Sequence, residues 1–467
     1  MSRILMVSSE ASPFAKTGGL ADVLGSLPAA LVRSGDEVAV VLPKYRGVEV
    51  APGGRIWEDL RVRVGPHTYF AGIDEIVRHG VRYLFVDIPV LYDRPGIYNE
   101  AGVDYPDNHL RFAALSQAAI GIARSIFRPD VFHAHDWQAG LLPLYVREYL
   151  TGDPTFMGTR CVLTIHNLGY QGNFPASVLT DVGLDAGVFH PEGAEFHGMV
   201  SFLKAGIVWA DAVTTVSPTY AREIQTPEYG FGMDGLLRSR SAKLSGIING
   251  VDYEEWNPET DGHLAANYSV RDLAGKRECK RAVLEEMGLP RDLEAPLIGI
   301  VSRFADQKGM DLVVAAAPLG RAALVVLGSG DTALETSFRQ LAQWYPEQCA
   351  VRVGYDDGLA HRIEAGADIF LMPSRYEPCG LNQIYSLRYG TVPVVRSTGG
   401  LADTVESDTG FKFRAATSAA LSAAVEGACE AFRDRKGWAK RVRLGMEQDF
   451  SWDASAKAYR ELYAQSG

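Results

Sequence analysis

The hexapeptide Thr-Gly-Gly-Leu-Ala-Asp occurs twice in this chain, as Thr17–Asp22 and as Thr398–Asp403. Each copy follows a short apolar run and begins a stretch with helical spacing, which is typical of a strand, a glycine turn and a helix start. Glycines in such a turn let a ligand approach the backbone, and the first helical turn offers unpaired N–H groups. Two copies in the two halves predict two domains of the nucleotide-binding type. A chance match between two ordinary turns is the alternative.

Length and composition fit two globular domains. A chain of 467 residues is long for one domain, and 47% hydrophobic with 22% charged residues is ordinary for a globular protein. The net charge of -11 argues against general binding of nucleic acid or of an acidic membrane, so an anionic ligand needs a local basic cluster. The five cysteines are widely spaced and lack a C-x-x-C pair, which suits a cytoplasmic location. We expect no signal peptide and no membrane span. The sequence leaves the oligomeric state open.

Apolar strands alternate with helical patterns in both halves. Strands are predicted at 4–7, 37–42, 81–86, 131–135, 162–166, 212–216, 297–301, 323–327, 350–353, 369–372 and 392–395. This alternation predicts an α/β fold with parallel sheets that are covered on both faces. Because 249–293 is less periodic, we place the domain junction just before it. The predicted N-terminal domain spans 1–245 and the C-terminal domain spans 246–448. A terminal helix within 449–467 could pack back on the N-terminal domain.

Polar residues that follow the strands are candidate ligands, because open parallel sheets bind ligands beyond the carboxyl ends of their strands. Lys16 beside the first glycine turn resembles a phosphate site, although the P-loop spacing is missing; a solvated surface charge is equally possible. His133 and His135 point to one face of their strand. Such a pair can bind a metal, but no third ligand is evident, so we favour a structural role for His133. Asp136 either caps the next helix or binds a ligand hydroxyl.

Two further strand ends carry candidate ligands. His166 and Asn167 lie in a glycine-rich segment, which favours a site over a buried structural pair. Arg303 and Lys308 follow one strand, and two cations in an acidic chain suit a diphosphate, although either could be a surface charge.

The strongest local cluster is Pro373–Leu381, which follows the strand 369–372 and precedes a helix. Glu377 within it can bind sugar hydroxyls or stabilise positive charge on a sugar carbon; an ordinary helix-start glutamate is the alternative. We interpret the neighbouring Cys379 as a packing residue rather than a nucleophile, because no histidine partner is evident.

Together these motifs resemble the bacterial glycogen synthases and plant starch synthases. These are retaining glucosyltransferases of the GT-B fold, in which two Rossmann-like domains face a deep cleft. The resemblance covers nearly the whole chain, in order, and the set is far more specific than any single motif. The matching segments are KTGGL (16–20), HAHDW (133–137), HNLGYQG (166–172), SPTYARE (217–223), NGVD (249–252), SR (302–303), QKG (307–309), PSRYEPCGL (373–381) and TGGLAD (398–403).

The resemblance implies transfer of glucose, with retention, from ADP-glucose to the non-reducing end of an α-1,4-glucan, elongating glycogen. The N-terminal domain takes the acceptor side and the C-terminal domain the donor side. No cofactor and no metal is implied, because the two cations take the role that a divalent ion has elsewhere. The implied catalytic residues are Glu377, His166, Arg303 and Lys308. The implied donor-binding residues are Lys16, Gly18, Gly19, Arg303, Lys308, Tyr355, Cys379, Gly380, Leu381, Thr398, Gly399 and Gly400. The implied acceptor- and glucose-binding residues are Asp22, Tyr92, Asp136, Asn167 and Asn249.

Two departures from the broader pattern bear on mechanism. Tyr385 stands eight positions after Glu377, where more distant relatives often carry a second glutamate, so a two-glutamate double displacement is poorly supported. Gln138 stands where many members carry histidine, which puts one minor acceptor contact in doubt. The choice between ADP and UDP does not follow from spacing.

Other classes of protein remain possible at this point. A catalytically idle glucan- or nucleotide-binding relative is one, although it would be expected to lose at least one of Lys16, Arg303, Lys308 and Glu377. A GT-B transferase with a small acceptor is another. A dinucleotide oxidoreductase is the least favoured, because the fingerprint glycine spacing is missing.

Overall fold

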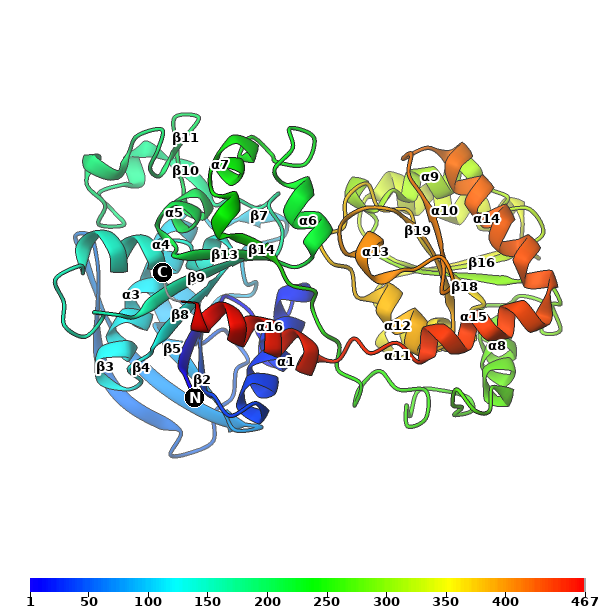
Figure 1. Cartoon of the computed structure of the whole chain (residues 1–467), viewed down its shortest axis with the longest axis horizontal. Coiled ribbons are helices and arrows are strands. Elements are labelled where there is room, and N and C mark those ends of the chain that lie inside the picture. Colours follow the sequence, from blue (N-terminus) through cyan, green and yellow to red (C-terminus); the bar gives the residue numbers. More distant parts are fainter. Residues whose placement is uncertain (466–467) are drawn as a thin grey trace. The chain divides into compact units, whose positions relative to one another are not determined.

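The computed structural model describes residues 1–465, which form two compact units. The first unit contains Met1–Val216, Ala221–Gly250 and the chain from Trp452 onward. The second contains Ser217–Tyr220 and Val251–Ser451. Apart from the short segment Ser217–Tyr220, the chain passes between the units after Gly250 and again after Ser451. The boundaries expected from the sequence are 245–246 and 448–449. Each unit is an α/β layered structure built on its own sheet (Figure 1).

The first unit is built on a nine-stranded sheet in the order β14-β13-β9-β8-β1-β2-β5-β4-β3. Its strands are β1 (Arg3–Val7), β2 (Glu37–Pro43), β3 (Arg55–Val64), β4 (His67–Arg78), β5 (Val81–Asp87), β8 (Val131–His135), β9 (Arg160–Ile165), β13 (Ala212–Thr215) and β14 (Leu244–Gly246). The strands from β14 to β5 are parallel, and their central members are buried because helices cover both faces. Smaller pairings join β6 (Asn99–Glu100) to β7 (Val103–Asp104), and β12 (Met199–Ser201) to β10 (Asn173–Pro175) and β11 (Glu195–Phe196).

The helices of the first unit include one from the far end of the chain. They are α1 (Gly19–Arg33), α2 (Pro89–Tyr92), α3 (Asn108–Ser125), α4 (Leu141–Leu144), α5 (Phe202–Trp209), α7 (Asp234–Ser239) and α16 (Trp452–Ala464). In Figure 1 the red α16 lies along the blue α1. Tyr459 is fully buried there, and Arg460 pairs with Asp36 at 2.9 Å. The helix α6 (Pro218–Glu223) begins in the second unit, which includes Ser217–Tyr220, and continues from Ala221 in the first.

The hairpin of β3 and β4 corrects the expectation of wholly parallel sheets. Both strands are antiparallel to their neighbours, and the sequence analysis predicts neither of them. In β3 the buried Leu60, Val62 and Val64 alternate with exposed charged residues, so only one face is apolar. Such alternation is typical of an antiparallel pair with one solvated face. A strand of this kind has no continuous apolar run, which is the pattern used to predict the other strands. The apolar face covers α3, where a Cβ on Gly121 would lie 3.2 Å from the Leu60 side chain.

Two helical segments are irregular or hard to recognise from the sequence. The chain is α-helical over Leu141–Leu144 and continues as a π-helix over Tyr145–Tyr149. The less periodic region 249–293 contains α8 (Ala274–Glu286). Only Cys279, Val283 and Leu284 of α8 are buried, so its apolar stripe is too narrow to stand out among the charged residues around it.

The second unit is built on a six-stranded parallel sheet in the order β17-β16-β15-β18-β19-β20. Its strands are β15 (Leu297–Val301), β16 (Ala323–Gly328), β17 (Cys349–Val353), β18 (Ile369–Met372), β19 (Val392–Arg396) and β20 (Phe411–Phe413). The remaining helices are α9 (Met310–Ala316), α10 (Thr332–Trp344), α11 (Asp357–Gly366), α12 (Asn382–Arg388), α13 (Gly399–Thr404), α14 (Ser418–Arg433) and α15 (Arg435–Met446). The alternation of strand and helix agrees with the predicted α/β class.

The strand orders locate the binding crevice of each sheet. In the first unit the chain runs outward from β1 through β2 to β5, then returns to β8 on the other side of β1. In the second unit it runs from β15 to β17, then returns to β18 on the other side of β15. Ligands of open α/β sheets bind at such switch points, beyond the carboxyl ends of the strands. We therefore expect the sites beyond β1 and β8, and beyond β15 and β18.

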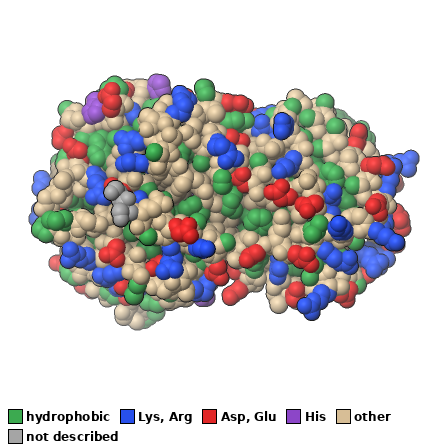
Figure 2. All heavy atoms as spheres, viewed as in Figure 1, with side chains coloured by type: hydrophobic (Ala, Val, Ile, Leu, Met, Phe, Trp, Pro, Cys, Tyr) green, Lys and Arg blue, Asp and Glu red, His purple; other side chains and the backbone are tan. Residues whose placement is uncertain are grey.

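The surface shows basic and acidic side chains intermixed on the face drawn in Figure 2. Among residues 1–465, no helix is long and apolar enough to cross a membrane.

Candidate active site

A cavity of about 190 Å³ lies at the switch point of the second unit. Residues from the ends of β15 and β18 and from the segments that follow them form its walls. They are Val301, Ser302, Arg303, Lys308, Met310, Leu371, Met372, Ser374 and Asn382. Arg303 and Lys308 of the predicted set thus line one cavity, because both follow β15.

Glu377 lies next to this cavity with one of its carboxylate oxygens already bound. The residue is only 5% exposed. Its Oε2 accepts hydrogen bonds from Lys308 Nζ at 2.6 Å and from Ser374 Oγ at 2.8 Å. Within residues 1–465, Oε1 has no hydrogen-bond partner. One oxygen therefore holds the carboxylate in place and leaves the other available to a ligand.

Arg303 differs from the other basic groups near β18. It is exposed, and in the described part of the chain its guanidinium has neither an ion pair nor a hydrogen bond. Arg375, by contrast, binds both carboxylate oxygens of Asp311 at 2.7 Å. An exposed guanidinium without a partner at the mouth of a cavity suits an anionic ligand.

The second hexapeptide packs against the backbone of the Glu377 turn. Gly399 has φ +44, and a Cβ there would lie 1.8 Å from the Glu377 carbonyl oxygen. A Cβ on Gly400 would lie 2.1 Å from the Cys379 carbonyl oxygen. Gly380 also has a positive φ, at +71. Close backbone packing requires Gly399 and Gly400, and the positive φ favours glycine at 380. Cys379 itself is buried.

The first hexapeptide has the same sequence and a different environment. A Cβ on Gly18 or Gly19 would meet no atom within 4 Å, and Gly18 has the extended φ of -166. Neither packing nor backbone conformation requires glycine there, whereas a ligand that approaches the backbone would. Lys16 forms an ion pair with Asp22 at 2.6 Å across this turn. The turn is anchored by Glu10, which accepts hydrogen bonds from Thr17 N and Oγ1.

This contrast predicts opposite effects for two alanine substitutions. Gly18→Ala should leave the free energy of unfolding within about 1 kcal/mol of the original value, because the folded backbone tolerates alanine. It should still lower kcat/KM at least about tenfold, which corresponds to roughly 1.4 kcal/mol lost to a clash with the ligand. Gly399→Ala should instead destabilise the second unit. Urea unfolding and steady-state kinetics on both variants check this, and normal kcat/KM in Gly18→Ala would remove the case for ligand approach at the first turn.

Three histidines and an aspartate gather at the ends of β8 and β9 in the first unit. His135 Nδ1 lies 3.0 Å from His166 Nε2. His133 Nε2 lies 2.6 Å from Thr164 Oγ1, and its Nδ1 lies 2.8 Å from the Tyr463 hydroxyl on α16. His133 is therefore held by structural partners, as predicted from the sequence.

Asp136 is a strained and buried carboxyl group beside His166. Its φ is +56, which is unusual for a residue with a side chain, and its Oδ1 accepts a hydrogen bond from His166 N at 2.6 Å. Burial raises the pKa of Asp136 to about 7, although hydrogen bonds from the backbone of His166 and Asn167 act in the opposite direction. Strained residues with shifted pKa values cluster at functional sites.

The histidines make stability depend on pH. Burial lowers the pKa of His133 and of His166 to about 3. Burial also lowers the pKa of His135 well below its usual value. On His133 and His166 the unfolded chain takes up a proton near pH 6.5, whereas the folded chain does not until about pH 3. Stability should therefore fall as pH falls from 6.5 toward 3, by up to ~1.4 kcal/mol per pH unit for each histidine.

Urea unfolding at pH 7, 6 and 5 checks this dependence. His133→Gln should reduce the slope of the unfolding free energy against pH by the contribution of one proton. This holds even if the substitution also changes the stability at pH 7. The matched control is His79→Ala, which removes an exposed histidine and should keep the slope. An unchanged slope in His133→Gln would contradict the assignment.

Among the other predicted residues, Tyr92, Tyr355 and Asn249 lie apart from these clusters, whereas the backbone of Asn167 binds Asp136. Tyr92 is fully buried and its hydroxyl donates to the Arg111 carbonyl oxygen at 2.7 Å, so its side chain supports the interior. Tyr355 is 85% exposed at the start of the segment before α11. Asn249 is buried, and its Oδ1 has no hydrogen-bond partner in the described chain. Asn167 accepts from Gly169 N at 3.0 Å, which shapes the turn after β9.

Two residues of the site are missing from the predicted set. Glu10 anchors the first hexapeptide, and Ser374 binds the Glu377 carboxylate. Both lie within three residues of the end of a strand at a switch point, β1 and β18 respectively. Polar residues after a strand are too common for these two to be selected from the sequence without their contacts.

Comparison with known families assigns both units. A family described as the starch synthase catalytic domain matches residues 3–239. A family described as glycosyl transferases group 1 matches residues 295–430. The chain is similar to a glycogen synthase of Anaeromyxobacter dehalogenans, with 50% identity over 99% of each chain. It is also similar to a glycogen synthase of Koribacter versatilis, with 48% identity over 99% of this chain and 98% of the relative.

Solved structures agree with these matches. The catalytic domain of starch synthase IV from Arabidopsis thaliana, bound to ADP and acarbose, has a TM-score of 0.89 and 33% identity. The match covers 99% of this chain and 98% of that one. A sucrose-phosphate synthase from Thermosynechococcus elongatus has a TM-score of 0.61 at 19% identity over 100% of both chains, which supports the fold alone.

Proposed function

Because this chain belongs to the family of bacterial glycogen synthases and plant starch synthases, we propose that it elongates an α-1,4-glucan with glucose from ADP-glucose. The chain is a retaining glycosyltransferase of the GT-B fold that acts on a nucleotide sugar and a glucan. ADP as the nucleotide is supported by the starch synthase structure, which is bound to ADP. A cytoplasmic location is supported by the spacing of the five cysteines, which include no C-x-x-C pair.

One observation carries the proposal about the site. The Lys308–Glu377 ion pair lies beside a cavity at the switch point of the second unit. The Arg303 guanidinium, which has no partner among residues 1–465, lines the same cavity. We assign Arg303 and Lys308 to the diphosphate, where negative charge grows as the sugar leaves. We assign Oε1 of Glu377 to the glucose ring, since Oε2 is already bound. Lys308 thereby connects the leaving group with the carboxylate.

The remaining assignments are of binding rather than of bond making. We place Tyr355 against the adenine, and Gly18 and Gly19 close to the donor, because their backbone is open to a ligand. We place Asp136, His166 and Asn167 on the glucose and acceptor side. A neutral His166 can accept or donate one hydrogen bond to a sugar hydroxyl.

Product analysis tests the function. The full chain is incubated with glucose-labelled ADP-glucose and glycogen, and in parallel with free hexoses or with UDP-glucose. We expect label in glycogen that β-amylase releases as maltose, because that enzyme cuts α-1,4 chains from their non-reducing ends. Label in a disaccharide only would indicate a small-acceptor transferase, and no transfer at all would indicate a binding protein. Equal rates with UDP-glucose would contradict the preference for ADP.

The reaction should proceed without a divalent metal. The sequence has no D-x-D pair at a strand end, and two cations already face the cavity that we assign to the diphosphate. Exhaustive treatment with a strong chelator should leave kcat unchanged. Activity that disappears on chelation and returns with added Mg²⁺ or Mn²⁺ would overturn this expectation.

A further inference from the structure

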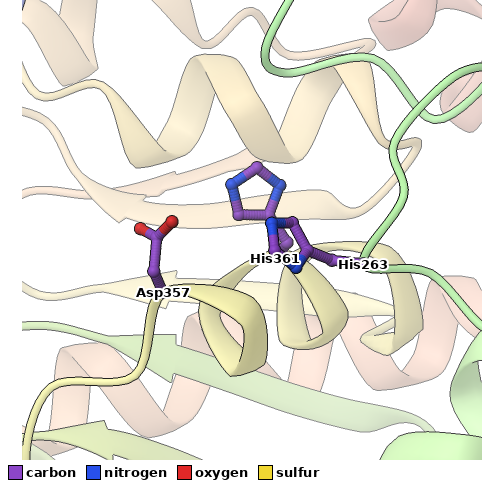
Figure 3. A group of neighbouring side chains, drawn as sticks. All are labelled: His263, Asp357 and His361. Carbon is purple, nitrogen blue, oxygen red and sulfur yellow. The ribbon is translucent and has the colours of Figure 1, made fainter.

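A second cluster of ligating side chains lies in the second unit, around the first turns of α11. His263, Asp357 and His361 each place one ligand atom within 4.8 Å of the others (Figure 3). Asp357 and His361 stand at i and i+4 on the helix, so they share a face, as paired metal ligands on helices do. His263 comes from the loop that precedes α8 and lies beside them. Nothing in the proposed reaction uses these three residues.

His361 is held in an orientation that suits a metal ligand. It is 2% exposed, and its Nδ1 lies 2.8 Å from Oδ2 of the buried Asp261. Trp256 stacks on its ring, with centroids 3.8 Å apart and planes 11° apart. A carboxylate on Nδ1 fixes the tautomer in which Nε2 carries the lone pair, and Nε2 has no hydrogen bond within residues 1–465.

Asp261 positions both histidines at once. Its Oδ1 accepts from His263 N at 2.8 Å, and its Oδ2 also accepts from the Tyr389 hydroxyl at 2.6 Å. These contacts hold the Asp261 carboxyl group behind the His361 ring, as carboxylates do behind metal-bound histidines.

The other two side chains have room to close on an ion. His263 and Asp357 are exposed. Glycine at position 358 leaves room beside the His263 ring, since a Cβ there would lie only 3.2 Å from His263 Nδ1. One oxygen of Asp357 accepts from the Tyr355 hydroxyl at 3.0 Å, which leaves the second oxygen for a metal. The nearby Arg362 is neutralised by Glu286 through contacts of 2.7 and 2.9 Å. Ligand atoms of a tetrahedral site lie roughly 3.4 Å apart, a small movement for two exposed side chains.

We propose that His263, Asp357 and His361 form a binding site for a divalent transition metal of the zinc type. Two imidazoles and one carboxylate are ligands that Zn²⁺ accepts, with water in the remaining position. The three ligands take no part in the proposed glucose transfer, and the inference does not depend on which sugar or nucleotide the protein uses.

Zinc titration of the tag-free, chelator-treated full chain tests the proposal. Competition with a chromophoric chelator should show one Zn²⁺ per chain, and zinc should raise Tm because it binds the folded state only. His263→Ala and Asp357→Ala should each weaken zinc binding by at least about tenfold and abolish the Tm shift. Both residues are exposed, so the variants should fold. The control His79→Ala removes an exposed histidine of the first unit and should bind zinc as the original chain does.

X-ray absorption at the zinc edge identifies the ligands directly. We expect a nitrogen and oxygen shell near 2.0–2.1 Å with two imidazoles, reduced to one in His263→Ala. A sulfur shell near 2.3 Å would place the zinc on a cysteine and overturn the proposal. Equal zinc affinity in the original chain and both variants, or no bound zinc, would overturn it as well.

Discussion

Replacing Arg303 with alanine is expected to lower kcat by two or more orders of magnitude, roughly the effect of losing one preorganised charge contact. The guanidinium has no ion-pair partner among residues 1–465, so its removal should leave the free energy of unfolding almost unchanged. Its charge acts mainly where the diphosphate departs, and such contacts favour the transition state over the ground state. Steady-state kinetics with a urea unfolding curve on the same preparation measure both quantities.

Lys308→Ala should produce a similar loss of kcat together with a loss of stability. Lys308 Nζ lies 2.6 Å from the buried Glu377 carboxylate, and removing one partner of a buried pair leaves the other charge uncompensated. The two variants therefore separate catalysis from folding, since Arg303→Ala should affect only the first. Arg339→Ala, which removes an exposed arginine of α10, is the matched control and should behave as the original chain. Near-normal kcat in both Arg303→Ala and Lys308→Ala would falsify the assignment.

The central strands could be predicted from the sequence because they are continuous apolar runs. β1 and β15 end where the apolar pattern ends, and the polar residues after them mark the switch points. The strands β3 and β4 could not be found this way, because one face of each meets solvent and carries charges. Strand pairing of this kind depends on a partner that a single segment does not reveal.

The candidate site divides in a similar way. The residue types and positions of Arg303, Lys308 and Glu377 were predictable, because each follows a strand of the second sheet. Which groups pair was not predictable, since the Lys308–Glu377 contact joins segments that are brought together only by the fold. Tyr92 was expected to bind a ligand, but its side chain is buried, because the position of a residue in a motif does not determine which way its side chain points. The two copies of the hexapeptide show it again, because identical glycines meet backbone in one copy and open space in the other.

The role of Glu377 leads to the second large expected effect. Glu377→Gln should retain donor binding and lose most of the turnover, by about two orders of magnitude or more. The amide keeps the shape of the side chain and can still accept from Lys308 and Ser374, so the cavity should persist. What disappears is the negative charge beside the sugar, which favours an oxocarbenium-like centre. Equilibrium binding of ADP-glucose, measured beside kcat, distinguishes this loss from a loss of affinity.

A covalent route through Glu377 makes a different prediction. It requires a glucosyl ester on the carboxylate that a glucan hydroxyl later attacks. The Glu377 side chain is poorly placed for such an attack, since its Oε2 is held by two hydrogen-bond donors. The position at which distant relatives carry a second glutamate is Tyr385 in this chain. Tyr385 stacks on Trp256 with centroids 3.8 Å apart, so no second carboxylate stands there. Quenched-flow mass spectrometry of the active enzyme should find no glucosylated peptide containing Glu377. An adduct that forms and decays as fast as the overall reaction would instead make Glu377 the nucleophile.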